Sequence, residues 1–246
     1  MHSQEQQLEQ TRYYERTARQ YDSMHVEAGD EHGVALSRIG ETLRRIGAGS
    51  VLDVGCGTGR GIKHLLDANP ELDARGIEPV EALLERAVEN GVPRERLTVG
   101  TGEQLPFEDR SFDAAIAIGV LHHVPDAGAV VAEMQRVARR AIFISDANRF
   151  GRGSMPVGLL KLLLAMTRLW PLAFRIRTLG RGYRVTEGDG LAYSYSAYDS
   201  VGQFRGWAEE LELTATVPTR MGSWFHPLLT ASHVLLTATR SGAPAG

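Results

Sequence analysis

Short apolar runs alternate along the chain with segments whose apolar residues recur at helical spacing. Strands are predicted at 51–54, 73–79, 96–99, 111–119 and 140–146, and helices at 34–46, 61–68, 80–90 and 127–139. A helix at 201–210 and two strands at 211–217 and 231–238 complete the pattern. Strands that alternate with helices and end in a strand pair predict a three-layer, doubly wound α/β domain.

The most informative stretch runs from Val51 to Gly61, where an apolar strand enters a turn with glycine at every second position. Glycine allows positive φ angles and lets backbone N–H groups come close to a ligand. The helix that follows begins with unpaired N–H donors, which favour negative charge. A dinucleotide fingerprint would need glycine where Arg60 or Ile62 stands, and the Gly-Lys-Ser/Thr of a phosphate-binding loop is absent. The pattern that remains is Asp53-x-Gly55-x-Gly57-x-Gly59.

This pattern resembles the first motif of the class I S-adenosylmethionine (SAM)-dependent methyltransferases, close to their small-molecule, ubiquinone- and menaquinone-biosynthesis-like branch. Later segments follow in the order of that family: an acidic residue that ends the second strand, a loop into Leu-Pro-Phe at 105–107, and Leu-His-His at 121–123. The resemblance implies a mostly parallel seven-stranded sheet with an antiparallel last strand, and SAM as the cofactor. It implies cofactor contacts from Asp53, Gly55, Cys56, Gly57, Glu78, Pro79, Thr101, Gly102, Glu103, Gly119 and Tyr21.

Some of these positions have alternatives. Glu78 lies at the carboxyl edge of the second strand, where a carboxylate can accept both ribose hydroxyls; otherwise it is a helix N-cap or an exposed charge. Thr101 stands where many relatives carry Asp, so adenine recognition through that position is weakened. Tyr21, with Tyr14, belongs either to a helical lid over the cofactor or to the aromatic residues that anchor an amphipathic helix.

Catalytic residues are harder to assign. Methyl transfer from a sulfonium needs no metal, so alignment and desolvation can supply most of the catalysis, and we expect no metal site. A general base is needed only where the acceptor must lose a proton. The base candidates, in descending order, are His123, His122, Asp146 and His226. Asp146 ends the fifth predicted strand, and it suits equally a group that orients the acceptor or a simple loop cap.

Residues 151–200 interrupt the alternation of strands and helices. Leucines crowd residues 155–170, and so broad an apolar face predicts packing into the core or a hydrophobic acceptor pocket. Docking on a membrane surface is disfavoured, because only a few cations interrupt the stretch. Next comes a basic cluster of Arg175, Arg177, Arg181 and Arg184. This cluster suits a solvated loop or an anionic substrate.

We divide the chain into four parts. They are an N-terminal helical lid (1–46), a SAM-binding core (47–150), a cap insertion (151–200), and a closing helix and strand pair (201–240). The resemblance covers the core well and the last strands loosely, whereas the insertion matches no group that the sequence identifies.

Composition narrows the classes of partner. A net charge of −3 and an isoelectric point near 6.3 give no basic footprint for nucleic acid. The single cysteine excludes an internal disulfide, no apolar run approaches the ~20 residues of a membrane span, and the N-terminus lacks a signal-peptide pattern. We therefore expect a cytoplasmic enzyme that methylates a small, partly hydrophobic metabolite on oxygen, nitrogen or carbon. The alternatives are a transfer RNA methyltransferase of the same fold and a SAM-binding protein without activity; the missing glycine disfavours a nicotinamide oxidoreductase.

Overall fold

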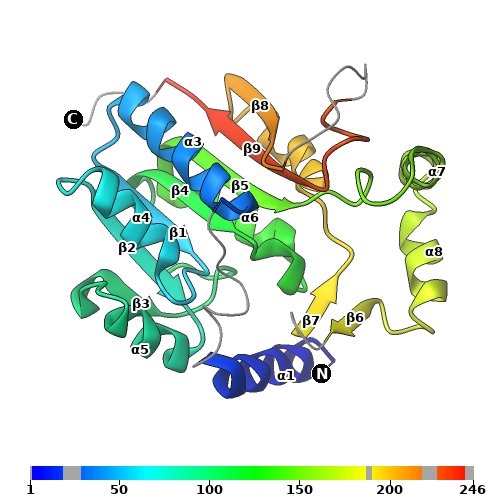
Figure 1. The fold of residues 1–246 in the computed structure, drawn as a ribbon, viewed down its shortest axis with the longest axis horizontal. Helices are drawn as coiled ribbons and strands as arrows, with labels where there is room; N and C mark the ends of the chain where they lie inside the picture. Colours follow the sequence, from blue (N-terminus) through cyan, green and yellow to red (C-terminus); the bar gives the residue numbers. More distant parts are fainter. Residues whose placement is uncertain (1, 19–28, 187–189, 218–225, 242–246) are drawn as a thin grey trace.

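A seven-stranded sheet forms the centre of the computed structural model, which describes residues 2–18, 29–186, 190–217 and 226–241 (Figure 1). In chain order its strands are β1 (Ser50–Val54), β2 (Asp73–Glu78), β3 (Leu97–Val99), β4 (Phe112–Ile118), β5 (Ala138–Ala147), β8 (Glu210–Ala215) and β9 (His233–Thr239). In space their order is β3-β2-β1-β4-β5-β9-β8. The first five strands run parallel, and β9 runs antiparallel to both of its neighbours. The predicted doubly wound sheet with an antiparallel last strand is therefore confirmed.

Helices cover both faces of this sheet. On one face lie α3 (Glu31–Ile46), α4 (Arg60–Ala68) and α5 (Glu81–Glu89), and on the other lie α6 (Ala127–Val137) and the 3₁₀ helix at Ala197–Phe204. Each face of the sheet has its own hydrophobic core, and successive side chains of β5 point into one or the other. Ile142 and Ile144 pack with α6, whereas Phe143 packs with α3. All three side chains are fully buried, as expected for a central strand with helices on both sides.

The strand order reverses between β1 and β4. The chain leaves β1 towards β2 on one side and returns to β4 on the other, so the connections after β1 and β4 diverge at the carboxyl edge of the sheet. In doubly wound sheets a ligand crevice forms outside the strand ends at this point. The fold therefore places the glycine-rich loop after β1 beside the Leu-His-His segment after β4.

Several elements lie outside the three layers (Figure 1). These are α1 (His2–Thr17), α7 (Met155–Met166), α8 (Trp170–Arg177), and a two-stranded antiparallel hairpin of β6 (Tyr183–Thr186) and β7 (Gly190–Tyr193). β7 contacts α1 and also the short 3₁₀ turn at Leu121–His123. The insertion thus reaches back to the carboxyl edge of the sheet, although it follows β5 in the chain.

Three predictions about helices that were made from the sequence are wrong. The helix predicted at 201–210 is the 3₁₀ helix that ends at Phe204, because Gly206 turns the chain at a φ of 81° and β8 begins at Glu210. The helix predicted at 127–139 ends at Val137, since Ala138 already pairs with β4. Packing of the apolar 155–170 face into the core is also wrong, because Gly158 is the one fully buried residue of α7.

Candidate functional site

The glycine-rich loop joins the carboxyl end of β1 to the first turn of α4. Gly55 and Gly57 have φ angles of 74° and 51°, which residues with a side chain rarely adopt. The N–H groups of Gly55 and Cys56 donate to the Ile77 carbonyl at 2.8 and 3.1 Å, which fixes the loop against β2. A side chain at Gly55 would collide with Val120, whereas the space beside Gly57 is open. The backbone at Gly57 is therefore the part of the loop that a ligand can approach.

Asp53 and Cys56 lie beneath this loop. A Cβ added at Gly61 would overlap Asp53 Oδ2, so this carboxyl group packs against the first turn of α4. Burial, together with the charge of Glu78, raises the pKa of Asp53 to about 7. The Cys56 thiol faces β2, and burial also raises its pKa. Neither residue belongs to the wall of the pocket described below, and their contacts with a cofactor stay predictions.

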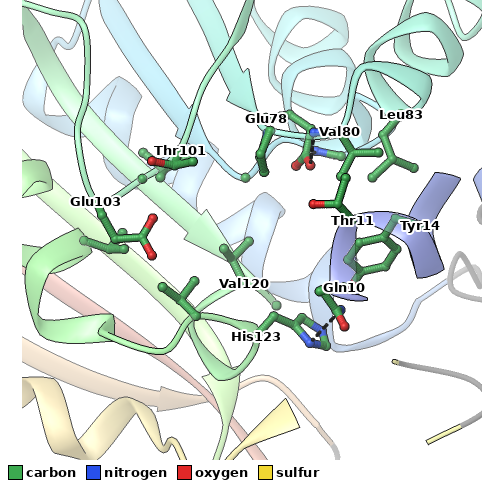
Figure 2. Close-up of a pocket in the computed structure, with 18 of the residues that line it drawn as sticks. Gln10, Thr11, Tyr14, Glu78, Val80, Leu83, Thr101, Glu103, Val120 and His123 are labelled. Atoms are coloured by element: carbon green, nitrogen blue, oxygen red, sulfur yellow. Dashed lines mark hydrogen bonds between the residues drawn. The ribbon is translucent and has the colours of Figure 1, made fainter. Parts of the chain in front are cut away.

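Glu78 ends β2 and stands beside the glycine-rich loop (Figure 2). Its Oε2 accepts the Gly57 N–H at 3.2 Å, and its Oε1 accepts the Val80 N–H at 3.1 Å. A carboxylate offers about four lone-pair positions, so both oxygens can still accept a hydroxyl group. Burial raises the pKa of Glu78 to about 7, against the opposing effect of the two N–H groups. The structure therefore holds an acceptor for hydroxyl groups at a fixed place in the crevice.

One continuous pocket extends from Glu78 to His123 along the carboxyl ends of β1, β2 and β4 (Figure 2). Eight of the eleven predicted cofactor residues lie in its wall, together with the base candidate His123: Gly55, Gly57, Glu78, Pro79, Thr101, Gly102, Glu103 and Gly119. Apolar side chains complete this wall, among them Val54, Val80, Leu83 and Val130. The structure therefore brings most of the predicted cofactor residues together in one pocket. Tyr21 lies outside the described residues.

Helix α1 covers the pocket with three residues, Gln10, Thr11 and Tyr14. Gln10 Oε1 accepts the Leu191 N–H from β7 at 2.6 Å, and Gln10 Nε2 lies 3.3 Å from His123 Nδ1. The Tyr14 ring meets the His123 ring edge-on, with 5.9 Å between ring centroids. Sequence reasoning missed Gln10 because nothing local distinguishes it from the other glutamines of α1. Its partner on β7 is 181 residues away.

The His123 ring has a defined orientation. Its Nδ1 lies 2.7 Å from the Leu191 carbonyl oxygen, and a carbonyl can only accept a hydrogen bond. Nδ1 therefore carries a proton, and in the neutral ring Nε2 is the nitrogen without one. This is the protonation state that a general base requires.

His122 and Asp146 form a second pair beside it. His122 Nδ1 donates to Asp146 Oδ1 at 2.8 Å, and the Ala147 N–H donates to the same oxygen at 2.6 Å. Burial pushes the pKa of Asp146 upward, but the attraction and hydrogen bond of His122, with the Ala147 N–H, hold it below its usual value. The two histidine rings lie 3.9 Å apart, centroid to centroid. Asp146 therefore orients His122, which in turn packs against His123.

His226 lies elsewhere. Its side chain is exposed, and its Nδ1 lies 2.8 Å from Thr230 Oγ1. It is not among the residues that line the pocket, and neither are His122 and Asp146. Of the four predicted base candidates, the structure places only His123 in the wall of this pocket. The catalytic roles of all four stay predictions.

The residues present fit SAM. The open backbone at Gly57 suits its amino acid end, and Glu78 suits its ribose hydroxyls. A Cβ at Gly102 would press into Val54 and Val130, so the chain there runs flat against the apolar wall that would face adenine. The wall therefore offers the carboxylates of Glu78 and Glu103, backbone N–H groups and apolar side chains, which suits an uncharged sugar and base.

Comparison with known proteins identifies the family of this chain. A family model described as a methyltransferase domain matches residues 52–143. A probable tRNA methyltransferase 9B from Bos taurus is 34% identical over 104 residues, which cover 42% of this chain and only 21% of that protein. A phosphatidylethanolamine N-methyltransferase from Cereibacter sphaeroides is 33% identical over 146 residues, which cover 53% of this chain and 69% of that protein.

The fold has a match among solved structures. The crystal structure of magnesium protoporphyrin IX methyltransferase from Synechocystis PCC 6803 with bound SAM aligns with a TM-score of 0.55 at 16% identity, covering 93% of this chain and 94% of that one. At this identity the match shows the fold alone. With the family model, the relative covered over most of its length and the sheet order, it shows that this chain belongs to the class I SAM-dependent methyltransferases.

Proposed function

We propose that this chain transfers the methyl group of SAM to a small, partly hydrophobic metabolite that binds beside His123, in the pocket that α1 covers. The observation that carries this proposal is the cover over the pocket. Gln10 and Tyr14 of α1 close it from above, and Gln10 is held by β7. An acceptor must fit beneath this cover, which favours a small molecule over a folded polymer.

Bound SAM would supply an electrophilic methyl group on a sulfonium. The chain would hold the cofactor with Gly55 and Gly57 at its amino acid end and Glu78 at its ribose. Gly102 and Glu103 would lie near its adenine. Because displacement at the methyl group is in-line, the main task of the protein is to align the acceptor and exclude water, and the α1 cover serves both.

His123 is the proposed general base for an acceptor that must lose a proton, such as a hydroxyl or an ammonium group. The Leu191 carbonyl holds the ring with Nδ1 protonated, so Nε2 can accept the proton. His122 packs against this ring and is itself held by Asp146, and the proposed role of both residues is to position His123. Acceptors that need no proton removal would depend on His123 less.

The acceptor is proposed to be amphiphilic. Val124 and Pro125 adjoin His123 in the wall of the pocket, and Tyr14 faces it from α1. A site with an imidazole amid apolar side chains suits a molecule with one polar group on a hydrophobic body. The similarity to a phosphatidylethanolamine N-methyltransferase supports this choice.

The test is turnover with matched variants. Purified protein is incubated with SAM and a panel of small phenols, amines and carboxylic acids, and release of S-adenosylhomocysteine is measured. His123→Asn should lower kcat by about 10²–10⁴-fold for a hydroxyl acceptor, with SAM affinity in calorimetry unchanged. His64→Asn on α4 is the control. Turnover on bulk RNA with none on any small molecule would overturn the proposal.

A transfer RNA acceptor is the second candidate, and the similarity to the probable tRNA methyltransferase supports it. Such an enzyme would bind RNA through phosphate contacts, so its affinity would fall steeply with salt. A SAM-binding protein without activity is the third, and it would bind cofactor yet release no S-adenosylhomocysteine with any acceptor. We also propose the cytoplasm as the site of the reaction and keep the four-part division of the chain as a proposal.

A further inference from the structure

Helices α7 and α8 present apolar side chains to solvent. Ten large hydrophobic residues between 155 and 179 are exposed: Met155, Val157, Leu159, Leu160, Leu163, Met166, Leu169, Leu172, Ile176 and Leu179. Several are far more than half exposed, with Met166 at 75% and Leu179 at 87%. A contiguous apolar surface of this kind marks a site of interaction.

The two helices are anchored to the body of the protein with this side outward. Trp170 Nε1 donates to Ser194 Oγ at 2.7 Å, and Phe174 is buried beside it. Lys161 Nζ donates to the carbonyl oxygens of Arg149 and Arg152 at 2.8 and 2.7 Å. The inner side of each helix therefore has partners of its own, and the leucines face away from them. Figure 1 shows both helices at the periphery of the molecule.

The charge of this segment differs from that of the whole chain. Residues 147–186 contain eight of the 27 lysines and arginines and no aspartate or glutamate. Six of these arginines are exposed: Arg152, Arg168, Arg175, Arg177, Arg181 and Arg184. Burial and then the charges of Arg177 and Arg152 lower the pKa values of both Lys161 and Arg184. The cations thus lie close enough to repel each other, and they give the segment a positive potential.

Exposed leucines next to exposed arginines distinguish between three possible occupants of this surface. A second copy joined by a two-fold axis would bring the same arginines against these, which repel. A nucleic acid would pair with the arginines but leave the leucines in water. An anionic lipid bilayer accepts both groups, since leucines enter the boundary between headgroups and acyl chains while arginines reach lipid phosphates.

We propose that α7 and α8 form a docking surface for the face of an anionic lipid bilayer. The helices lie in the interface and do not span it. Among the described helices none is long and apolar enough to cross a bilayer by itself; α7 and α8 reach that length and composition only as a pair, with a bend of 119° between them. The sequence disfavoured docking because cations within the leucine run are few. In the structure the next segment of the chain adds the arginines.

The test uses the full chain and sucrose-loaded vesicles that are sedimented. The wild type should bind vesicles of phosphatidylcholine with phosphatidylglycerol, and bind vesicles of phosphatidylcholine alone at least tenfold more weakly, on the order of the cationic contribution. Leu160→Ser with Leu163→Ser should weaken binding to the anionic vesicles by about tenfold or more. Arg175→Gln with Arg177→Gln should weaken it to a similar degree, about fivefold for each arginine.

Two control pairs change apolar or basic residues at other exposed positions. Val88→Ser with Leu211→Ser, and Arg38→Gln with Arg45→Gln, should leave vesicle binding unchanged. Calorimetric SAM affinity should be the same in all variants, which shows that the core is folded. Three results would overturn the proposal. They are no binding of the wild type to anionic vesicles, a dimer that the leucine changes dissolve, and binding of transfer RNA with no effect of the leucine changes.

Discussion

Replacing Glu78 by glutamine should make the stability of the protein less dependent on pH and should lower its cofactor affinity. The change keeps the shape of the side chain and removes a charge that is buried at the end of β2, but the one remaining oxygen can accept only one of the Gly57 and Val80 N–H groups. Burial raises the pKa of Glu78 from 4.5 to about 7, so the native state holds a proton that the unfolded chain loses near pH 4.5. Between these two values the unfolded state binds fewer protons, and the free energy of unfolding falls as pH rises.

The size of this effect follows from the two pKa values. One pKa unit corresponds to about 1.4 kcal/mol, so ionising Glu78 costs the folded protein roughly 3 kcal/mol by about pH 8. Glu78→Gln removes that cost. The effect on Asp53 has the same direction, because the charge of Glu78 contributes to its raised pKa. Relative to the wild type, the variant should therefore gain about 3 kcal/mol of stability between about pH 5 and about pH 8, most of it below pH 7.

SAM affinity should change in the opposite direction. Ribose hydroxyls would donate to the ionised carboxylate, and hydrogen bonds to a charged group contribute about 1.5–3 kcal/mol. Loss of that interaction should raise the dissociation constant for SAM by roughly 10- to 100-fold. Affinity of the wild type should also rise with pH towards about pH 8 as the carboxyl group ionises, and affinity of Glu78→Gln should not follow it.

Urea unfolding at several pH values and calorimetry with SAM measure both effects on the same samples. Glu85→Gln on the exposed side of α5 is the control and should alter neither quantity. A constant stability difference between variant and wild type across this pH range would refute the raised pKa. Unchanged SAM affinity would refute the ribose assignment, even if the stability result agreed.

Three glycine substitutions separate effects on function from effects on stability. Gly57→Ala adds a methyl group in the open space beside the loop, at a φ of 51°. SAM affinity in calorimetry should fall, with a loss of stability of only about 1 kcal/mol. An equal loss of stability in Gly57→Ala and Gly61→Ala would contradict this prediction. Gly61→Ala puts a Cβ onto Asp53, so thermal unfolding should show the larger loss, about 2 kcal/mol or more. In Gly190→Ala the added methyl group would collide with the Gln10 side chain and push α1 away from β7. KM for the acceptor should therefore rise while vesicle binding is retained. An unchanged KM would argue against α1 as a cover of the pocket.

Most of the sheet could be predicted because its strands depend on local pattern. Runs such as Ala114 to Ile118 are apolar throughout and can only be buried between two helical layers. The error at 201–210 has a local cause as well, since Phe204 and Trp207 have helical spacing but Gly206 breaks the helix between them. The sequence of α7 describes an apolar helix and does not say what covers it, which is why core packing was one of the two alternatives predicted for this segment.

The candidate site divides in the same way. Glu78, Gly57 and Gly119 end strands or open loops, so position in the pattern is sufficient to place them at the carboxyl edge. The cover could not be predicted, because it depends on pairing between distant segments. Gln10 reaches the pocket only through its bond to Leu191, and its residue type alone predicts no such contact.

The insertion after β5 contributes to both the proposed docking surface and the pocket. Its first half, α7 and α8, exposes leucines and arginines at the periphery. Its second half, β6 and β7, returns to the pocket, where Leu191 binds the side chains of Gln10 and His123. A hydrophobic acceptor that leaves a bilayer at α8 would therefore meet the wall of the pocket along one continuous segment of chain. Because the contacts of Leu191 are made by its backbone, substitutions on the docking surface leave them intact, and docking and turnover can be measured independently of each other.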